Sequence, residues 1–104
     1  MGYRSEIAIA ILPSVWENAP DNVKEAFKEI FETPNIEEAE RIVFHHGCIK
    51  WYQSYPLVAT IEDWLKSLDE VEYGLLELGE DYSDVRTAGD NWSFNLNFVR
   101  KIDF

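Results

Sequence analysis

Residues 4–12 have a period of two, in which isoleucine and alanine alternate from residue 7 to residue 11, and this pattern constrains the fold more than any other feature of the chain. The two faces of such an extended segment differ: Ile7, Ile9 and Ile11 on one, Ala8 and Ala10 on the other. A period of two that is rich in β-branched residues is typical of a β-strand. Because both faces are apolar, we expect this strand inside a sheet rather than at its edge.

Two segments have the 3.6-residue period of amphipathic helices. After a connector over residues 13–19, the first is expected over residues 20–32, starting at Pro20, with the apolar stripe Val23, Ala26, Phe27, Ile30 and Phe31. The second is expected over residues 56–69, starting at Pro56, with the stripe Leu57, Val58, Ile61, Trp64, Leu65 and Leu68. Its outer face is expected to be charged, with Glu62, Asp63, Lys66, Asp69 and Glu70.

The remaining segments favour strands. Residues 37–46 and 48–53 are rich in strand-forming residues on either side of Gly47, which predicts a hairpin, although residues 36–41 could instead form a helical turn. A strand is expected over residues 73–78, then an acidic loop over 79–84 and a short strand through Val85. Gly89, Asp90 and Asn91 indicate a turn. Residues 92–98 alternate again, which predicts a half-buried final strand.

The order β-α-β-β-α-β-β predicts an α+β fold with two helices on one face of a mainly antiparallel sheet. A chain of 104 residues, 46% of them apolar, is long enough for one packed core. We therefore expect a single domain over residues 1–104.

The charge balance limits the classes of partner. Twenty acidic residues against nine basic ones give a net charge of −11, which repels nucleic acid and anionic membranes and attracts basic proteins. The alternative is that the acidity serves only solubility. A single cysteine, Cys48, excludes an intramolecular disulfide and fits the cytoplasm. The sequence has no signal-peptide pattern and no apolar run of membrane-spanning length.

The chain has no motif that predicts catalysis. His45, His46 and Cys48 are possible zinc ligands, but structural zinc needs four ligands, and adjacent strand residues point to opposite faces. The sequence has no phosphate-binding loop, nucleophile elbow or HExxH helix, and its clustered carboxylates lack the spacing of a calcium loop. We therefore expect no cofactor, no metal and no enzyme activity.

Acidic residues gather in the segment from 62 to 84, where nine carboxylates accompany the single base Lys66: Glu62, Asp63, Asp69, Glu70, Glu72, Glu77, Glu80, Asp81 and Asp84. In the first helix, by contrast, Lys24 and Lys28 can pair with Asp21 and Glu25 at i,i+3. The later segment is thus the predicted partner-binding surface. Carboxylates about 6 Å apart on one helix are too sparse to imitate duplex DNA fully, which carries about one charge per 1.7 Å.

Aromatic residues adjoin these charges at Trp51, Tyr52 and Tyr55, and such residues often anchor protein interfaces. If residues 51 and 52 lie in a strand, one of the two side chains should turn away from the core. An exposed aromatic patch could also build a homodimer. A structural or assembly module of that kind, acidic only for solubility, is the alternative function.

Three segments resemble small accessory proteins of bacteriophages: GYRSEIAI at 2–9, IKWYQSYP at 49–56 and LGEDYSD at 78–84. The resemblance covers most of the chain and brings no catalytic motif. It implies a gene used during infection, in the host cytoplasm. Small acidic phage proteins often disarm host defence by binding a nuclease or a CRISPR effector where its nucleic acid should lie. The expected function is therefore an anti-CRISPR-like inhibitor that binds a basic host protein and no nucleic acid directly.

Overall fold

The computed structural model describes residues 5–52, 54–79, 85–91, 94, 96–98 and 102–103. Its main sheet has five strands: β1 (Ser5–Ile11), β2 (Ile36–Glu37), β3 (Ile42–Ile49), β4 (Tyr73–Leu78) and β5 (Val85–Gly89). They lie in the order β2-β3-β1-β4-β5, and every neighbouring pair is antiparallel. The predicted α+β class with an antiparallel sheet is confirmed.

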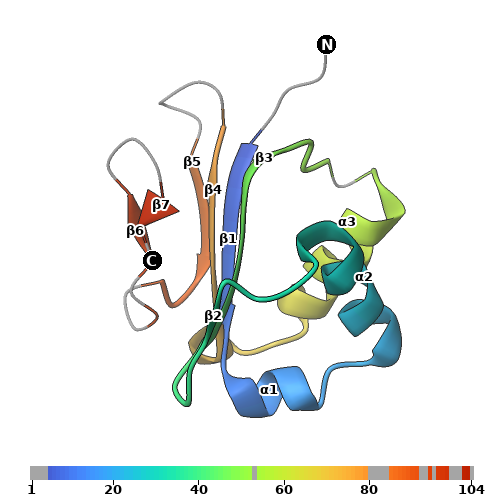
Figure 1. Cartoon of the computed structure of the whole chain (residues 1–104), viewed down its shortest axis with the longest axis vertical. Coiled ribbons are helices and arrows are strands. Elements are labelled where there is room, and N and C mark those ends of the chain that lie inside the picture. Colours follow the sequence, from blue (N-terminus) through green and yellow to red (C-terminus); the bar gives the residue numbers. More distant parts are fainter. Residues whose placement is uncertain are drawn as a thin grey trace.

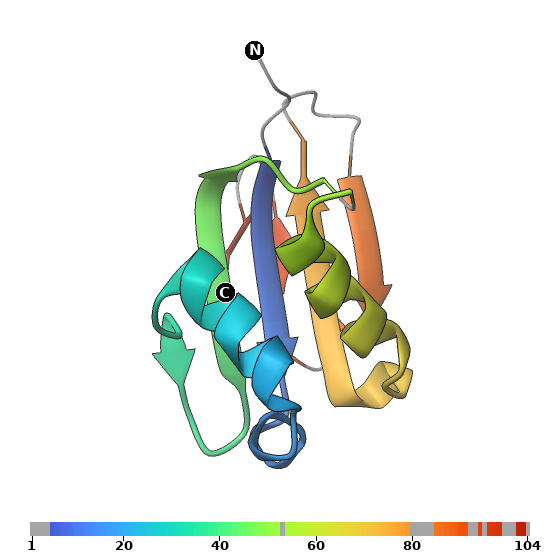
Figure 2. The ribbon, with the colours of Figure 1, turned by 90° about the vertical axis from the view of Figure 1, so that its right-hand side faces the viewer.

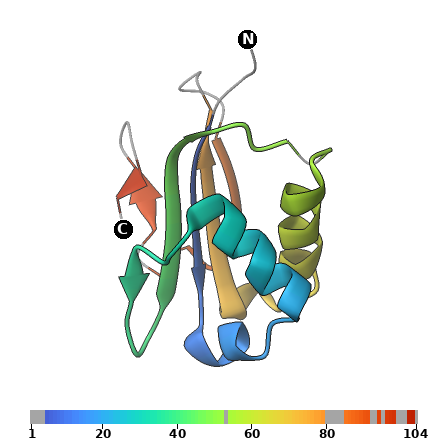
Figure 3. The ribbon, with the colours of Figure 1, turned by 45° about the vertical axis from the view of Figure 1, so that its right-hand side comes forward.

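One face of the sheet is covered by helices: α1 (Pro13–Glu17), α2 (Asp21–Phe31), α3 (Pro56–Lys66) and the short 3-10 helix η1 (Glu70–Glu72). Figure 1 shows this layer on one side of the sheet and a small second sheet on the other, formed by β6 (Asn97–Phe98) and β7 (Ile102–Asp103). In Figure 2, α2 and α3 lie side by side across the main sheet. Figure 3 shows α2 in front of the β3 side of the sheet.

The central strand is β1, as its two apolar faces predict. Its isoleucines pack under the helices with Phe27, Phe44 and Leu65. Its alanines pack on the opposite face, in a second cluster with Val43, Leu76, Phe94 and Leu96. Small side chains on that face allow the C-terminal segment to approach the sheet closely.

Helix α1 was not expected, because the sequence predicts a connector between the first strand and the first long helix. Five residues are too few to show a helical period, although Pro13 occupies a favourable first position. The ring of Trp16 in this helix packs 5.0 Å from the ring of Phe27 and 5.0 Å from that of Phe44, centroid to centroid. The short helix therefore closes one end of the core.

The predicted hairpin around Gly47 is wrong, because β3 runs through this residue without turning. Ser5 pairs with Ile49 while Ile7 pairs with His46, so the longer strand has one extra residue, which is a β-bulge. The hairpin lies earlier, between β2 and β3. The sequence signal at Gly47 marked a bulge, which is the other common role of glycine inside a strand.

The predicted final strand over residues 92–98 is also wrong in extent. Phe94 lies in a turn, and β6 begins only at Asn97; Trp92, Ser93 and Asn95 lie outside the described residues. The inward face of this segment is nevertheless apolar, because Phe94 and Leu96 are both buried. Shape complementarity with the alanine face of β1, rather than strand pairing, places these residues.

Candidate interaction surface

Six exposed carboxylates lie on α2, α3 and the start of η1, and we refer to them as the helical acidic face: Asp21, Glu25, Glu29, Asp63, Asp69 and Glu70. The first three follow one another at i,i+4 along α2, which packs beside α3 on the same face of the sheet. The exposed bases of these two helices are Lys28 and Lys66. The face therefore has a clear excess of negative charge.

The predicted pairing of the lysines in α2 with Asp21 and Glu25 is wrong. Lys24 donates instead to the backbone carbonyl of Glu17, at 2.9 Å between Nζ and O. Among the described residues, no ion pair involves Lys24 or Lys28. The carboxylates of α2 consequently belong to the negative surface as much as those after α3, and sequence reasoning assigned them too little weight.

The expected outward position of Glu62 is wrong, because its side chain is buried with 4% exposure. Its carboxylate accepts a hydrogen bond from the indole Nε1–H of Trp51 at 2.8 Å, and it is paired with the guanidinium of Arg86. The sequence held a signal for this burial. Glu62 lies four residues after Val58 and three before Leu65, and therefore on the same helical stripe as these two core residues.

Arg86 lies between two of the predicted surface acids. Its Nε donates to Glu77 Oε1 at 2.8 Å, and its other nitrogens contact Glu62. Burial lowers the pKa of Arg86, but the hydrogen bonds and charges of Glu62 and Glu77 outweigh burial and raise it overall. Glu62 and Glu77 therefore share the single positive charge of Arg86, and these largely buried carboxylates contribute less to the outer field than exposed ones do.

The other predicted site residues divide into three groups. Asp63, Asp69 and Glu70 are exposed, and Glu72 is half-buried. Trp51 is buried with 5% exposure, whereas Tyr52 and Tyr55 form an edge-on ring pair with centroids 5.3 Å apart, half-buried and exposed respectively. Glu80, Asp81 and Asp84 lie outside the described residues. Because Trp51 is in the core, it cannot anchor the homodimer proposed as the alternative.

The segment with His45, His46 and Cys48 has no built metal site. His45 Nε2 lies 2.8 Å from Glu6 Oε2, while the His46 Nδ1 accepts the backbone N–H of Cys48 at 3.2 Å within the bulge. Neighbouring strand positions direct the two imidazoles to opposite faces of the sheet. Over the described part of the chain, no three His, Cys, Asp or Glu side chains are arranged to hold a metal ion.

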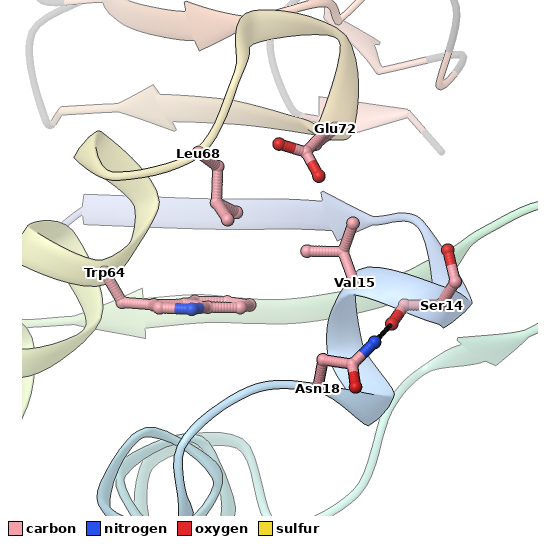
Figure 4. Close-up of a pocket in the computed structure, with 6 residues that line it drawn as sticks. All are labelled: Ser14, Val15, Asn18, Trp64, Leu68 and Glu72. Carbon is pink, nitrogen blue, oxygen red and sulfur yellow. Dashed lines mark hydrogen bonds between the residues drawn. The ribbon is translucent and has the colours of Figure 1, made fainter.

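A pocket of about 300 Å³ opens beside the helical acidic face, where α1 meets the end of α3 and η1. Figure 4 shows its six lining residues: Ser14, Val15, Asn18, Trp64, Leu68 and Glu72. Leu68 and Val15 point toward the space beside the flat face of the Trp64 indole. The pocket thus has a mixed lining of three apolar and three polar residues. Sequence reasoning missed it because its parts come from three elements.

Comparison with known proteins finds no family that matches the chain, no similar curated protein and no similar solved structure. Within the described residues, no helix has the length and apolar character needed to span a membrane. The acidic surface and the pocket are therefore the features that bear on function.

Proposed function

We infer that this chain is a binding protein whose helical acidic face covers a basic surface of a nucleic-acid-handling protein. The observation that carries this inference is the set of six exposed carboxylates on α2, α3 and the start of η1, where the exposed bases are two lysines. A field of this kind attracts basic proteins and speeds their encounter. Its sign opposes direct contact with DNA or RNA.

The arrangement of charge along α2 supports a functional role over simple solubility. Carboxylates at successive i,i+4 positions repel one another and weaken a helix by about 0.2–0.5 kcal/mol per pair. Solubility needs only a net charge, which could be distributed without this cost. Concentration of like charge on the helical layer is expected where a basic partner neutralises it.

An exposed apolar residue within this acidic surface favours a protein as the partner. Val71 in η1 is 66% exposed, between Glu70 and the half-buried Glu72. Protein interfaces combine such apolar contacts with a charged rim. If the acidic surface bound only small counter-ions, the exposed side chain of Val71 would make no contact with the bound species.

The specific form of the proposal is a phage-encoded, anti-CRISPR-like inhibitor of host defence. The partner in this proposal is a CRISPR effector or a defence nuclease, and binding blocks access of its nucleic acid. The inhibitor does so by occupying basic residues that would contact phosphates, without chemistry of its own. The carboxylates lie farther apart than the phosphates of duplex DNA. This spacing suits competition with part of the nucleic acid at the entrance of its channel better than imitation of a whole duplex.

The test is inhibition of DNA cleavage by a panel of purified CRISPR effector nucleases. We expect one nuclease to lose cleavage when the protein is added before the target DNA, and to lose less when the protein is added after target binding. Gel-shift assays should show weaker DNA binding by that nuclease. If no nuclease in the panel is inhibited, and plating of phage carrying the gene on CRISPR-immune hosts is not improved, the anti-CRISPR proposal is wrong.

A further inference from the structure

The pocket between α1, α3 and η1 combines three features that define one kind of occupant. Its lining is mixed, because Val15, Leu68 and one face of Trp64 are apolar, whereas Ser14 and Asn18 are polar (Figure 4). Its rim carries the carboxylate of Glu72. Its volume of about 300 Å³ is at the low end for ligand pockets, and suits a single long side chain rather than a folded element.

The carboxylate of Glu72 is held in a fixed position at this rim. Its Oε1 accepts the backbone N–H of Asp69 at 2.9 Å, in a capping box at the start of η1. Among the described residues, no hydrogen bond engages its Oε2. A carboxylate oriented by one hydrogen bond, with its second oxygen available, is prepared to accept a charged donor.

We propose that this pocket receives an arginine side chain of the basic partner. The aliphatic stem would pack on Val15 and Leu68, and the planar guanidinium would stack on Trp64 while donating to Glu72. Arginine suits this pairing better than lysine, because its flat, weakly hydrated group can stack on an aromatic ring and still form a hydrogen bond to a carboxylate. The proposal rests on the proposed function, since it names the anchoring contact of that interface.

The position of the pocket also favours a cationic occupant. Asp69 and Glu70 of the helical acidic face lie three and two residues before Glu72, so the field at the rim is negative. A neutral apolar side chain would gain the contact with Trp64 but would remove Glu72 from water without a donor, which is unfavourable. A guanidinium can both stack on the indole of Trp64 and donate hydrogen bonds to the carboxylate of Glu72.

The experiment uses acetyl-hexaarginine amide as the probe, with the matching hexacitrulline peptide as an uncharged control of the same shape. Titration is followed by NMR through the indole N–H of Trp64, assigned with the Trp64→Phe variant. We expect hexaarginine to shift this signal and the amides of η1, and hexacitrulline to leave them unchanged. Shifts confined to α2, away from the pocket, would overturn the pocket proposal while leaving the acidic surface intact.

Two variants with the same net charge distinguish hexaarginine binding in the pocket from general electrostatic attraction to the acidic surface. Glu72→Gln keeps an acceptor for the Asp69 N–H but removes the charge, and should weaken hexaarginine binding roughly tenfold. Glu40→Gln, the matched control at an exposed carboxylate outside the helical acidic face, should change it less than about twofold. Ser14→Phe, at an exposed rim position, should block the pocket without removing charge. Equal affinities for Glu72→Gln and Glu40→Gln would contradict the proposal, as would unchanged binding to Ser14→Phe.

Failure of this inference is distinguishable from failure of the proposed function. If hexaarginine enters the pocket but no defence nuclease is inhibited, the arginine site stands and the anti-CRISPR proposal fails. If a nuclease is inhibited equally by the wild type and by Ser14→Phe, the function stands and the pocket is not its anchor.

Discussion

The indole Nε1–H of Trp51 donates to the carboxylate of Glu62 at 2.8 Å, and both side chains are buried. This hydrogen bond joins the segment before α3 to the helix itself. Arg86 then connects the same carboxylate to β5 and, through Glu77, to β4. Two acids that the sequence assigns to the surface thus help to fix α3 on the sheet.

Replacing Arg86 with Met should lower the free energy of unfolding by roughly 2 kcal/mol. Removing one member of a buried ion pair leaves the other charge uncompensated, and the partial exposure of Arg86 moderates the usual loss. Adding Glu62→Gln to this variant should recover part of the loss, because the amide carries no charge and still accepts from Trp51. Urea denaturation of the two single variants and the double variant measures the coupling. Additive losses would show that Arg86 does not compensate Glu62.

Replacing Glu32 with Gly should raise the free energy of unfolding by about 1 kcal/mol. Glu32 ends α2 with φ 64° and ψ −73°, and the N–H of Thr33 bonds to the carbonyl of Phe31 at 2.8 Å across it. This is a strained γ-turn for any residue with a side chain. Glu29→Gly, the same chemical change within α2, should instead lower stability by about 1 kcal/mol. Denaturant midpoints that move in the same direction would contradict this account.

Two glycine substitutions compare an unstrained position in β3 with a strained one at the end of β5, and the first tests whether β3 runs through Gly47 without a turn. Gly47→Ala should be neutral or stabilising by about 0.5 kcal/mol, because the nearest atom to an added Cβ is 4.0 Å away. Gly89→Ala should cost roughly 2 kcal/mol or more, because φ is 71° and the Cβ would lie 2.2 Å from the carbonyl oxygen of Tyr73. Thermal unfolding compares the two. A large loss in Gly47→Ala would favour the turn that the sequence predicts there.

Tyr73 should be among the last tyrosines to ionise. Burial raises the pKa of Tyr73 above the ordinary 10.0, the charges of Glu62 and Glu70 raise it further, and Arg86 lowers it in part. Since the folded state holds this proton more tightly than the unfolded chain, the resulting stability is complete below about pH 10 and is lost as the pH rises through the folded-state pKa. The difference in tyrosinate absorbance between the wild type and Tyr73→Phe isolates this group. A difference curve with its midpoint below pH 10 would contradict the shift.

The parts of the fold that follow from local periodicity were predictable. The alternation around Ile9 predicts a central strand with two covered faces, and the structure places β1 there. The stripes after Pro20 and Pro56 predict two long helices, although α3 ends at Lys66 rather than at residue 69. Such segments carry their own signal because neighbouring positions alternate between core and solvent.

Features that depend on distant partners were not predictable in this way. Gly47 has the composition of a turn, but pairing of β3 with β1 on both sides of it makes a bulge instead. A charged residue such as Glu62 is ordinarily assigned to solvent, and its burial depends on Arg86, which is 24 residues away. The candidate surface changed for the same reason. The two acids that pair with Arg86 leave this surface, whereas the three exposed carboxylates of α2 join it, because no ion pair engages them among the described residues.

The central claim is that the helical acidic face, rather than net charge, binds the basic partner. The direct measurement is the association rate constant with any nuclease found to be inhibited in the cleavage panel, for two triple variants of identical net charge. Changing Glu25, Asp63 and Glu70 to Lys should slow association at least tenfold and reduce its salt dependence. Changing Glu32, Glu37 and Glu40 to Lys should slow it less than about threefold. Equal rate constants for the two variants would contradict the claim.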